Sequence, residues 1–210
     1  MSKQKIAATE FHGFACSARN ASATFYLEGR QALRHRELVK EMASQSAFMI
    51  GSHTFSRSPL SELESAESVQ YEIETGIRAL FNVTGSRYRH FRAPSGNLDN
   101  FGLLARSRMG LVIAGSTMKL EMAEIEAEAN ERQMSAFART AFITEKSELS
   151  LKQRFDEFSR ANDFQSTGYI FEDDTSQSNI WMLHWLLSFA ADKKMNFVRM
   201  DQCTGIAETF

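Results

Sequence analysis

The fold is decided by two short apolar runs, ATFYL at residues 23–27 and FMIG at residues 48–51. Short runs of aliphatic and aromatic residues that stop at a turn or a glycine are typical of buried strands. Apolar residues at helical spacing follow each run: Leu33, Leu38, Val39 and Met42 after the first, and Val69, Ile73, Ile77, Leu80 and Phe81, closed by Gly85, after the second. This order of strand and helix predicts parallel strands in an α/β fold.

The alternation continues along the rest of the chain. The sequence predicts further strands over residues 88–92, 111–115, 139–144, 169–171 and 196–200, and helices over residues 100–108, 119–134 and 179–195. We interpret residues 1–210 as a single domain, because this length suits one hydrophobic core. We expect a parallel sheet, open or closed into a barrel, with active groups at the carboxyl ends of its strands.

Composition excludes several classes of function. Hydrophobic residues make up 43% of the chain and charged residues 24%, with a net charge of -2 and a pI of about 6.2. This balance argues against an electrostatic grip on nucleic acid or on an anionic membrane. No apolar run is long enough for a membrane span, and no secretory signal is visible. We expect either a cytosolic protein or a mature or recloned form of a secreted one.

Several motifs in one order along the chain carry a family resemblance. They are ATFY followed by Gly29, IGSHTFS at residues 50–56, Ser61 to Leu63, Glu72, FRAPSGN at residues 91–97, and the ending from Phe197 to Gly205. On these residues the chain resembles the polysaccharide deacetylase family, and its fungal chitin deacetylases in particular. The resemblance implies a distorted (β/α) barrel and removal of acetyl groups from N-acetylglucosamine polymers such as chitin.

The resemblance also implies a metal centre. Family members hold a divalent cation, usually zinc, with one aspartate and two histidines, and the bound water attacks the amide carbonyl. Here His53 matches the first metal histidine, Arg57 replaces the second, His12 replaces the metal aspartate, and Phe11 replaces the general-base aspartate. Two histidines make a weak site, and a fixed positive charge at Arg57 opposes a cation. We therefore expect zinc binding at His12 and His53 to be weak or absent.

The remaining site residues follow from the other family motifs. Arg92, Pro94 and Gly96 match the third motif, in which Ser95 replaces a tyrosine. The motif of the acid histidine corresponds to Ile170–Glu172, followed by Asp173, and His184 is a second candidate for that histidine. The predicted catalytic residues are Arg92, Ser95, Glu172 and Asp173, and the predicted substrate-binding residues are Arg57, Pro94 and Gly96. We expect Arg92 to form an ion pair with Glu10, Glu172 or Asp173.

Three functional hypotheses fit these replacements, and they leave open whether the chain is an enzyme. It is a degenerate family member that binds a chitin-like polysaccharide with weak or no turnover, an active deacetylase with a rebuilt metal site, or an intracellular interaction protein that keeps only the scaffold. Trp181 and Trp185, four residues apart, belong either to the core or to a sugar platform.

The two cysteines, Cys16 and Cys203, are either two buried thiols or one disulfide. Fungal members of the family often tie their ends with such a bridge. The resemblance therefore predicts that Cys16 and Cys203 lie close enough to pair, in a protein that is secreted or held in the cell wall.

Overall fold

The computed structural model describes residues 16, 20–94, 109–114, 118–119, 131–132, 146, 149, 152–153, 171–172, 180–192 and 194–210. These residues fall into two compact units. The first unit contains the described residues from Cys16 to Ala114 and from Asn196 to Phe210, and the second contains those from Met118 to Met195. A single domain over residues 1–210 stays a prediction.

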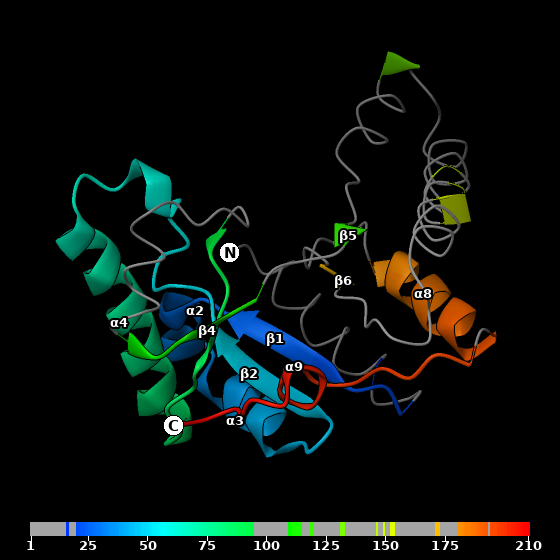
Figure 1. Ribbon diagram of the computed structural model, residues 1–210, viewed down its shortest axis with the longest axis horizontal. Coiled ribbons are helices and arrows are strands. Elements are labelled where there is room, and N and C mark those ends of the chain that lie inside the picture. Colours follow the sequence, from blue (N-terminus) through cyan, green and yellow to red (C-terminus); the bar gives the residue numbers. More distant parts are fainter. Residues whose placement is uncertain are drawn as a thin grey trace. The chain divides into compact units, whose positions relative to one another are not determined.

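The first unit is built on a parallel sheet with the strand order β1-β2-β3-β4 (Figure 1). Its strands are β1 (Ala23–Leu27), β2 (Phe48–Ser52), β3 (His90–Phe91) and β4 (Val112–Ile113). β1 and β2 pair along their whole length, whereas β2 and β3 share the single register pair Ser52↔Phe91. The α/β class with a parallel sheet is confirmed, and the apolar runs at residues 23–27 and 48–51 lie in its two longest strands.

Three helices belong to this sheet: α2 (Gly29–Arg34), α3 (Arg36–Ser44) and α4 (Ala66–Thr84). The single predicted helix over residues 33–42 is instead α2 and α3, which meet at His35 outside the helical conformation. The Ser65 hydroxyl caps the start of α4, and Gly85 ends it with φ 76°, a left-handed conformation that glycine adopts without strain. A 3₁₀ turn, η1 (Leu60–Glu62), precedes α4.

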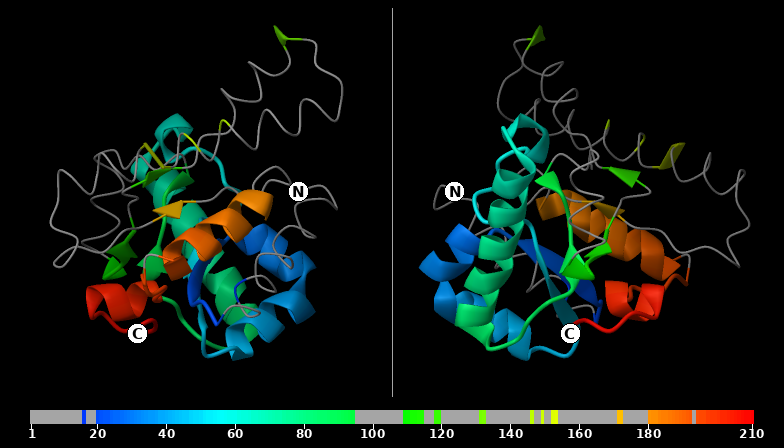
Figure 2. Two further views of the ribbon diagram at one scale, coloured as in Figure 1. Left: turned by 90° about the vertical axis from the view of Figure 1, so that its right-hand side faces the viewer. Right: turned by 60° about the vertical axis from the view of Figure 1, so that its left-hand side comes forward.

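The core fixes which way the site residues face. A buried cluster joins η1 and α4 to the strand ends, and its members are Leu60, Val69, Ile73, Ile77, Phe91, Ala93 and Leu111. Because side chains alternate along a strand, Phe91 faces α4 while His90 and Arg92 face the opposite side of the sheet. α4 lies along one side of this sheet (Figure 2).

The last predicted strand, over residues 196–200, is wrong. Residues 195–199 lie outside helix and strand, and α9 (Met200–Thr204) follows them. The Arg199 main-chain N–H donates to the Gln202 side chain, and Gly205 ends the helix in the left-handed region. Val198 is 51% exposed, so this apolar side chain is not buried in the sheet.

The second unit contains β5 (Met118–Lys119), which pairs in parallel with β6 (Phe171–Glu172), and α8 (Ile180–Asp192). α8 confirms the predicted helix over residues 179–195, and β6 overlaps the predicted strand over residues 169–171. Lys119 lies in a strand, so the predicted helix does not begin there. The predictions over residues 100–108 and 139–144 lie outside the described residues. Among the described helices, none is long and apolar enough to cross a membrane.

No disulfide joins Cys16 to Cys203. Cys16 is buried, whereas Cys203 is exposed on α9. The predicted pairing rested on a terminal strand beside the first strand, and a short helix takes the place of that strand. The alternative of two buried thiols holds for Cys16 but not for Cys203.

Candidate functional site

The carboxyl ends of the first three strands come together at one edge of the sheet. The main-chain N–H of His53 donates to the Leu27 carbonyl at 3.0 Å, and that of Arg92 donates to the Ser52 carbonyl at 2.9 Å. The residues that follow β1, β2 and β3 are therefore aligned across neighbouring strands. This is the edge at which open and closed α/β sheets place their active groups.

His53 and Arg92 meet directly at this edge. Nδ1 of His53 lies 2.9 Å from the main-chain carbonyl oxygen of Arg92. A carbonyl oxygen only accepts, so Nδ1 carries a proton, and Nε2 is the acceptor whenever the ring is neutral. A histidine ligand to a metal is commonly oriented in this way, by donating its other ring N–H to a carbonyl. His53 therefore presents Nε2 as its ligand or hydrogen-bond acceptor atom.

Arg92 is only 5% exposed, and Pro94 is buried after it. Across the sheet, burial raises the pKa of the Tyr26 hydroxyl far above its ordinary value, and the charge of Arg92 lowers it only in part. Tyr26 is therefore neutral at physiological pH and does not balance the guanidinium. The three predicted carboxylate partners of Arg92 have no described side chains, and that ion pair stays a prediction.

Arg57 lies in the loop after β2 and is tied to the end of β1. Its Nη1 is 3.6 Å from Oε1 of Glu28, which directly follows β1. The Arg57 side chain is 37% exposed and that of Glu28 is 12% exposed. The position that resembles the second metal histidine thus carries a fixed positive charge, held by a carboxylate of the same edge.

The loop that carries His53 and Arg57 is held in an unusual conformation. Thr54 and Arg57 have φ values of 63° and 65°, in the left-handed region that branched and long side chains rarely adopt. The buried Thr54 hydroxyl accepts the N–H of Arg57 at 3.1 Å, and the Thr54 carbonyl accepts the N–H of Gly29 at 2.9 Å. These hydrogen bonds offset the cost of the strained backbone. Strained conformations of this kind are found most often at functional sites.

Two residues outside the predicted site hold this loop from α4. Glu72 is a buried carboxylate whose Oε1 accepts the hydroxyl of Ser56 at 2.6 Å and also the Ser56 main-chain N–H. Gly76 lies so close that a Cβ there would stand 2.5 Å from the carbonyl carbon of Thr54. Sequence reasoning gave no functional role to Glu28, Glu72 or Gly76, although Glu72 stood at the family's spacing.

The structure brings His53 and Arg92 together and places Arg57 and Pro94 in the segments that follow the same strands. Glu172 is the last residue of β6, where its backbone pairs with Lys119. His12, Ser95, Gly96 and Asp173 lie outside the described residues. Trp181, His184 and Trp185 lie in α8, but their side chains are not described. In the described part of the chain, no three histidine, cysteine, aspartate or glutamate side chains could hold a metal.

Comparisons with known proteins show similarity in sequence and in fold. The sequence model of the polysaccharide deacetylase family matches residues 16–114. A comparison with curated proteins finds no match. Among solved structures, a peptidoglycan N-acetylglucosamine deacetylase is similar with a TM-score of 0.70 and 18% identity, over 96% of this chain and 84% of that one.

A pseudoenzyme of carbohydrate esterase family 4 from Bacillus anthracis is similar with a TM-score of 0.68 and 12% identity. The match covers 100% of this chain and 64% of that one. A mutant of that pseudoenzyme has restored enzymatic activity and is similar with a TM-score of 0.65 and 13% identity, over 96% of this chain and 65% of that one. At these identities the structures establish the fold, which is the predicted fold of the deacetylase type.

Proposed function

Because residues 16–114 match the sequence model of the polysaccharide deacetylase family, we propose that the chain is a member of this family that binds an N-acetylglucosamine polymer and deacetylates it weakly or not at all. Chitin is the polymer that the motifs favour. Peptidoglycan is the polymer named for the structurally similar N-acetylglucosamine deacetylase. On this proposal the protein works where such polymers occur, outside the cell or in the cell wall.

The ion pair between Arg57 and Glu28, at 3.6 Å, carries the proposal. A guanidinium has no lone pair to offer a metal and stays charged at every physiological pH. At the position of the second metal histidine it removes a ligand and adds a positive charge that repels the cation. Arg57 therefore does not fit the three-ligand zinc site that the family uses.

The same edge offers groups that suit sugar binding. Nε2 of His53 accepts a hydrogen bond when the ring is neutral, because Nδ1 donates to the Arg92 carbonyl. Arg57 is a partly exposed donor at the same edge. An N-acetylglucosamine unit carries hydroxyl and amide N–H donors and an acetyl carbonyl acceptor, which match these two groups. Binding without turnover needs only this complementarity, whereas turnover also needs a base and a polarised carbonyl.

The test is co-sedimentation of the purified chain with insoluble chitin and with peptidoglycan, together with acetate release from both. We expect binding to at least one polymer, weaker binding in His53→Ala and Arg57→Met, and acetate release near the background. Arg78→Met is the matched control, because Arg78 is an exposed arginine on α4.

Each other outcome selects a different function. A folded protein that binds neither polymer would contradict the proposal and favour an interaction protein on the same scaffold. Metal-dependent acetate release that is lost in His12→Ala and in His53→Ala would favour a deacetylase with a rebuilt site.

A further inference from the structure

β2 leads to His53, and β3 leads to Arg92. These two strands pair with each other only at their carboxyl ends. β2 pairs with β1 over five residues, but with β3 only at Ser52↔Phe91. Before that pair, Ile50 of β2 and Arg89 before β3 each donate a main-chain hydrogen bond to another part of the chain. That part is the C-terminal tail, residues 206–210.

The tail runs antiparallel to the segment that precedes and begins β3. Tyr88 and Thr209 form an antiparallel bridge, and the N–H of Arg89 donates to the Glu208 carbonyl at 2.9 Å. The N–H of Phe210 donates to the Arg87 carbonyl at 3.1 Å. The tail is therefore a short strand-like segment against Arg87–His90.

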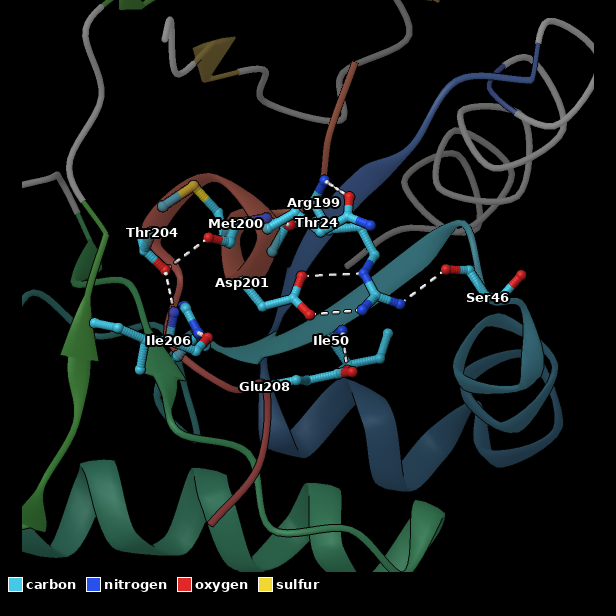
Figure 3. Close-up of polar contacts among 11 residues, drawn as sticks. Thr24, Ser46, Ile50, Arg199, Met200, Asp201, Thr204, Ile206 and Glu208 are labelled. Carbon is cyan, nitrogen blue, oxygen red and sulfur yellow. Dashed lines mark hydrogen bonds and ion pairs between the residues drawn. The ribbon is translucent and has the colours of Figure 1, made fainter. Parts of the chain in front are cut away.

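Glu208 also reaches β2 with its side chain. Its Oε1 accepts the main-chain N–H of Ile50 at 3.1 Å (Figure 3). Ile50 is fully buried, so this N–H has no water to turn to. Glu208 thus bonds to β2 through its carboxylate and to Arg89 through its backbone, and it spans the gap where the two strands do not pair.

We infer that Glu208 is a positioning residue for the site, because it sets the spacing of the strands that bring His53 to the Arg92 carbonyl. His53 is the third residue after Ile50, and Arg92 is the third residue after Arg89. Each stretch is about 10 Å long at the rise of a strand. A change in the distance between Ile50 and Arg89 therefore changes the distance between His53 and the Arg92 carbonyl, because only three residues of extended chain separate the members of each pair.

The role of this contact in polymer binding rests on the proposed function, but the contact itself can be tested without any polymer. The ring nitrogens of His53 are followed by ¹⁵N NMR and assigned with His53→Gln. In the native protein the spectrum should show the neutral tautomer with the proton on Nδ1. In Glu208→Ala and Glu208→Asp the His53 signals should shift toward those of a mixture of the two tautomers, since neither side chain reaches the Ile50 N–H.

Glu208→Gln is the rescuing variant, because its amide oxygen reaches as far as the carboxylate and accepts the same hydrogen bond. It should keep the native His53 signals. Thr209→Ala is the matched control in the same tail, since the Thr209 bridge to Tyr88 is made by the backbone. If the native protein binds polymer, Glu208→Asp should weaken binding roughly tenfold, as loss of supporting contacts around a site commonly does.

The variants separate the possible results. Native His53 signals in a folded Glu208→Asp protein would overturn the inference, and so would His53 signals that change equally in Thr209→Ala. A Glu208→Gln protein that behaves like Glu208→Asp would also overturn it, because reach would then not matter. If the native protein binds no polymer while the His53 signals follow the reach of residue 208, the proposed function fails and the positioning role stands.

Discussion

Nη1 of Arg57 and Oε1 of Glu28 lie 3.6 Å apart, and they join the loop after β2 to the end of β1. A metal centre at this edge would tie the same segments together through its ligands. In this chain the ion pair between Arg57 and Glu28 makes that connection.

The first prediction concerns zinc. The purified protein should contain well under one equivalent of zinc, because Arg57 repels the cation and supplies no ligand. Arg57→His should raise zinc affinity by roughly tenfold or more, since it removes the charge and adds an imidazole. Metal analysis and calorimetric titration measure both quantities.

Arg57→Met is the control for that experiment, because it removes the charge without adding a ligand. It should change the free energy of unfolding by no more than about 1 kcal/mol, since the ion pair is partly exposed. Stoichiometric zinc in the native protein that disappears in His53→Ala would contradict the prediction.

A second prediction concerns turnover. Acetate release from chitin oligomers should stay near the background, even with added zinc or cobalt. Phe11 stands in place of the general base, and loss of such a base typically costs about 10²- to 10⁴-fold in rate. The combined variant Phe11→Asp, His12→Asp and Arg57→His restores the family's residues at three positions, and it should release acetate faster than the native protein.

The control for this variant is the same combination with His53→Ala, which should return the rate to the background. Rapid metal-dependent release by the native protein would contradict the prediction. So would a restored variant that folds, binds zinc and polymer, and still shows no gain.

Local patterns in the sequence were sufficient to predict the first unit's frame. The strands over residues 23–27 and 48–51 and the helix ended by Gly85 follow from hydrophobic spacing and glycine conformation, which are properties of a few neighbouring residues. The placement of His53 after β2 and Arg92 after β3 follows from the same pattern. Their alignment across the sheet follows from parallel pairing.

The contacts that hold the site could not be predicted in this way. The bonds from Glu72 to Ser56 and from Glu208 to Ile50 join residues far apart in sequence, and in both the partner is partly or wholly a main-chain N–H. A main-chain donor leaves no signature in residue type. The final strand was mispredicted for a related reason, since an apolar run near Val198 resembles a strand whether or not a neighbour is present.

A third prediction concerns the close packing of α4 on the site loop. Gly76→Ala should destabilise the fold by about 1–3 kcal/mol, despite the better helix propensity of alanine. The new Cβ would lie 2.5 and 2.6 Å from the carbonyl carbon and oxygen of Thr54, and backbone atoms cannot rotate away. Because Thr54 follows His53, the same change should weaken polymer binding. Chemical denaturation and co-sedimentation measure the two effects.

The matched control is Gly85→Asn at the end of the same helix. A side chain there meets nothing within 4 Å, and asparagine tolerates the left-handed φ of 76°. We expect its unfolding free energy to change by less than about 1 kcal/mol. A Gly76→Ala protein that is as stable as the native one would show that the loop moves aside at little cost.

The last prediction concerns pH and the pair formed by Arg199 and Asp201. Nε and Nη2 of Arg199 lie 3.0 and 2.6 Å from the two carboxylate oxygens of Asp201, and Nη1 donates to the Ser46 carbonyl at 2.8 Å (Figure 3). Burial raises the pKa of Asp201, but the hydrogen bonds and charge of Arg199 outweigh this and hold that pKa below its ordinary value of 3.8.

A lowered pKa in the folded state means that the unfolded chain binds the proton more readily. The pair therefore contributes its full stability above the ordinary pKa of 3.8, and this contribution is lost as the pH falls below that value toward the folded pKa. Asp201→Asn removes the contribution. It should lower the unfolding free energy by about 1–3 kcal/mol at neutral pH, which is the usual loss for hydrogen bonds between charged groups.

The difference between the native protein and Asp201→Asn should stay constant from neutral pH down to about pH 5 and shrink as the carboxylate takes up its proton. Denaturant unfolding at a series of pH values measures this difference directly, since all other titrating groups are common to both proteins. Asp192→Asn serves as the control, because Asp192 is exposed at the end of α8 and its replacement should cost less than about 0.5 kcal/mol. A difference that persists unchanged to well below pH 3.8, or that grows as the pH falls, would show that Asp201 stabilises the fold by something other than its charge.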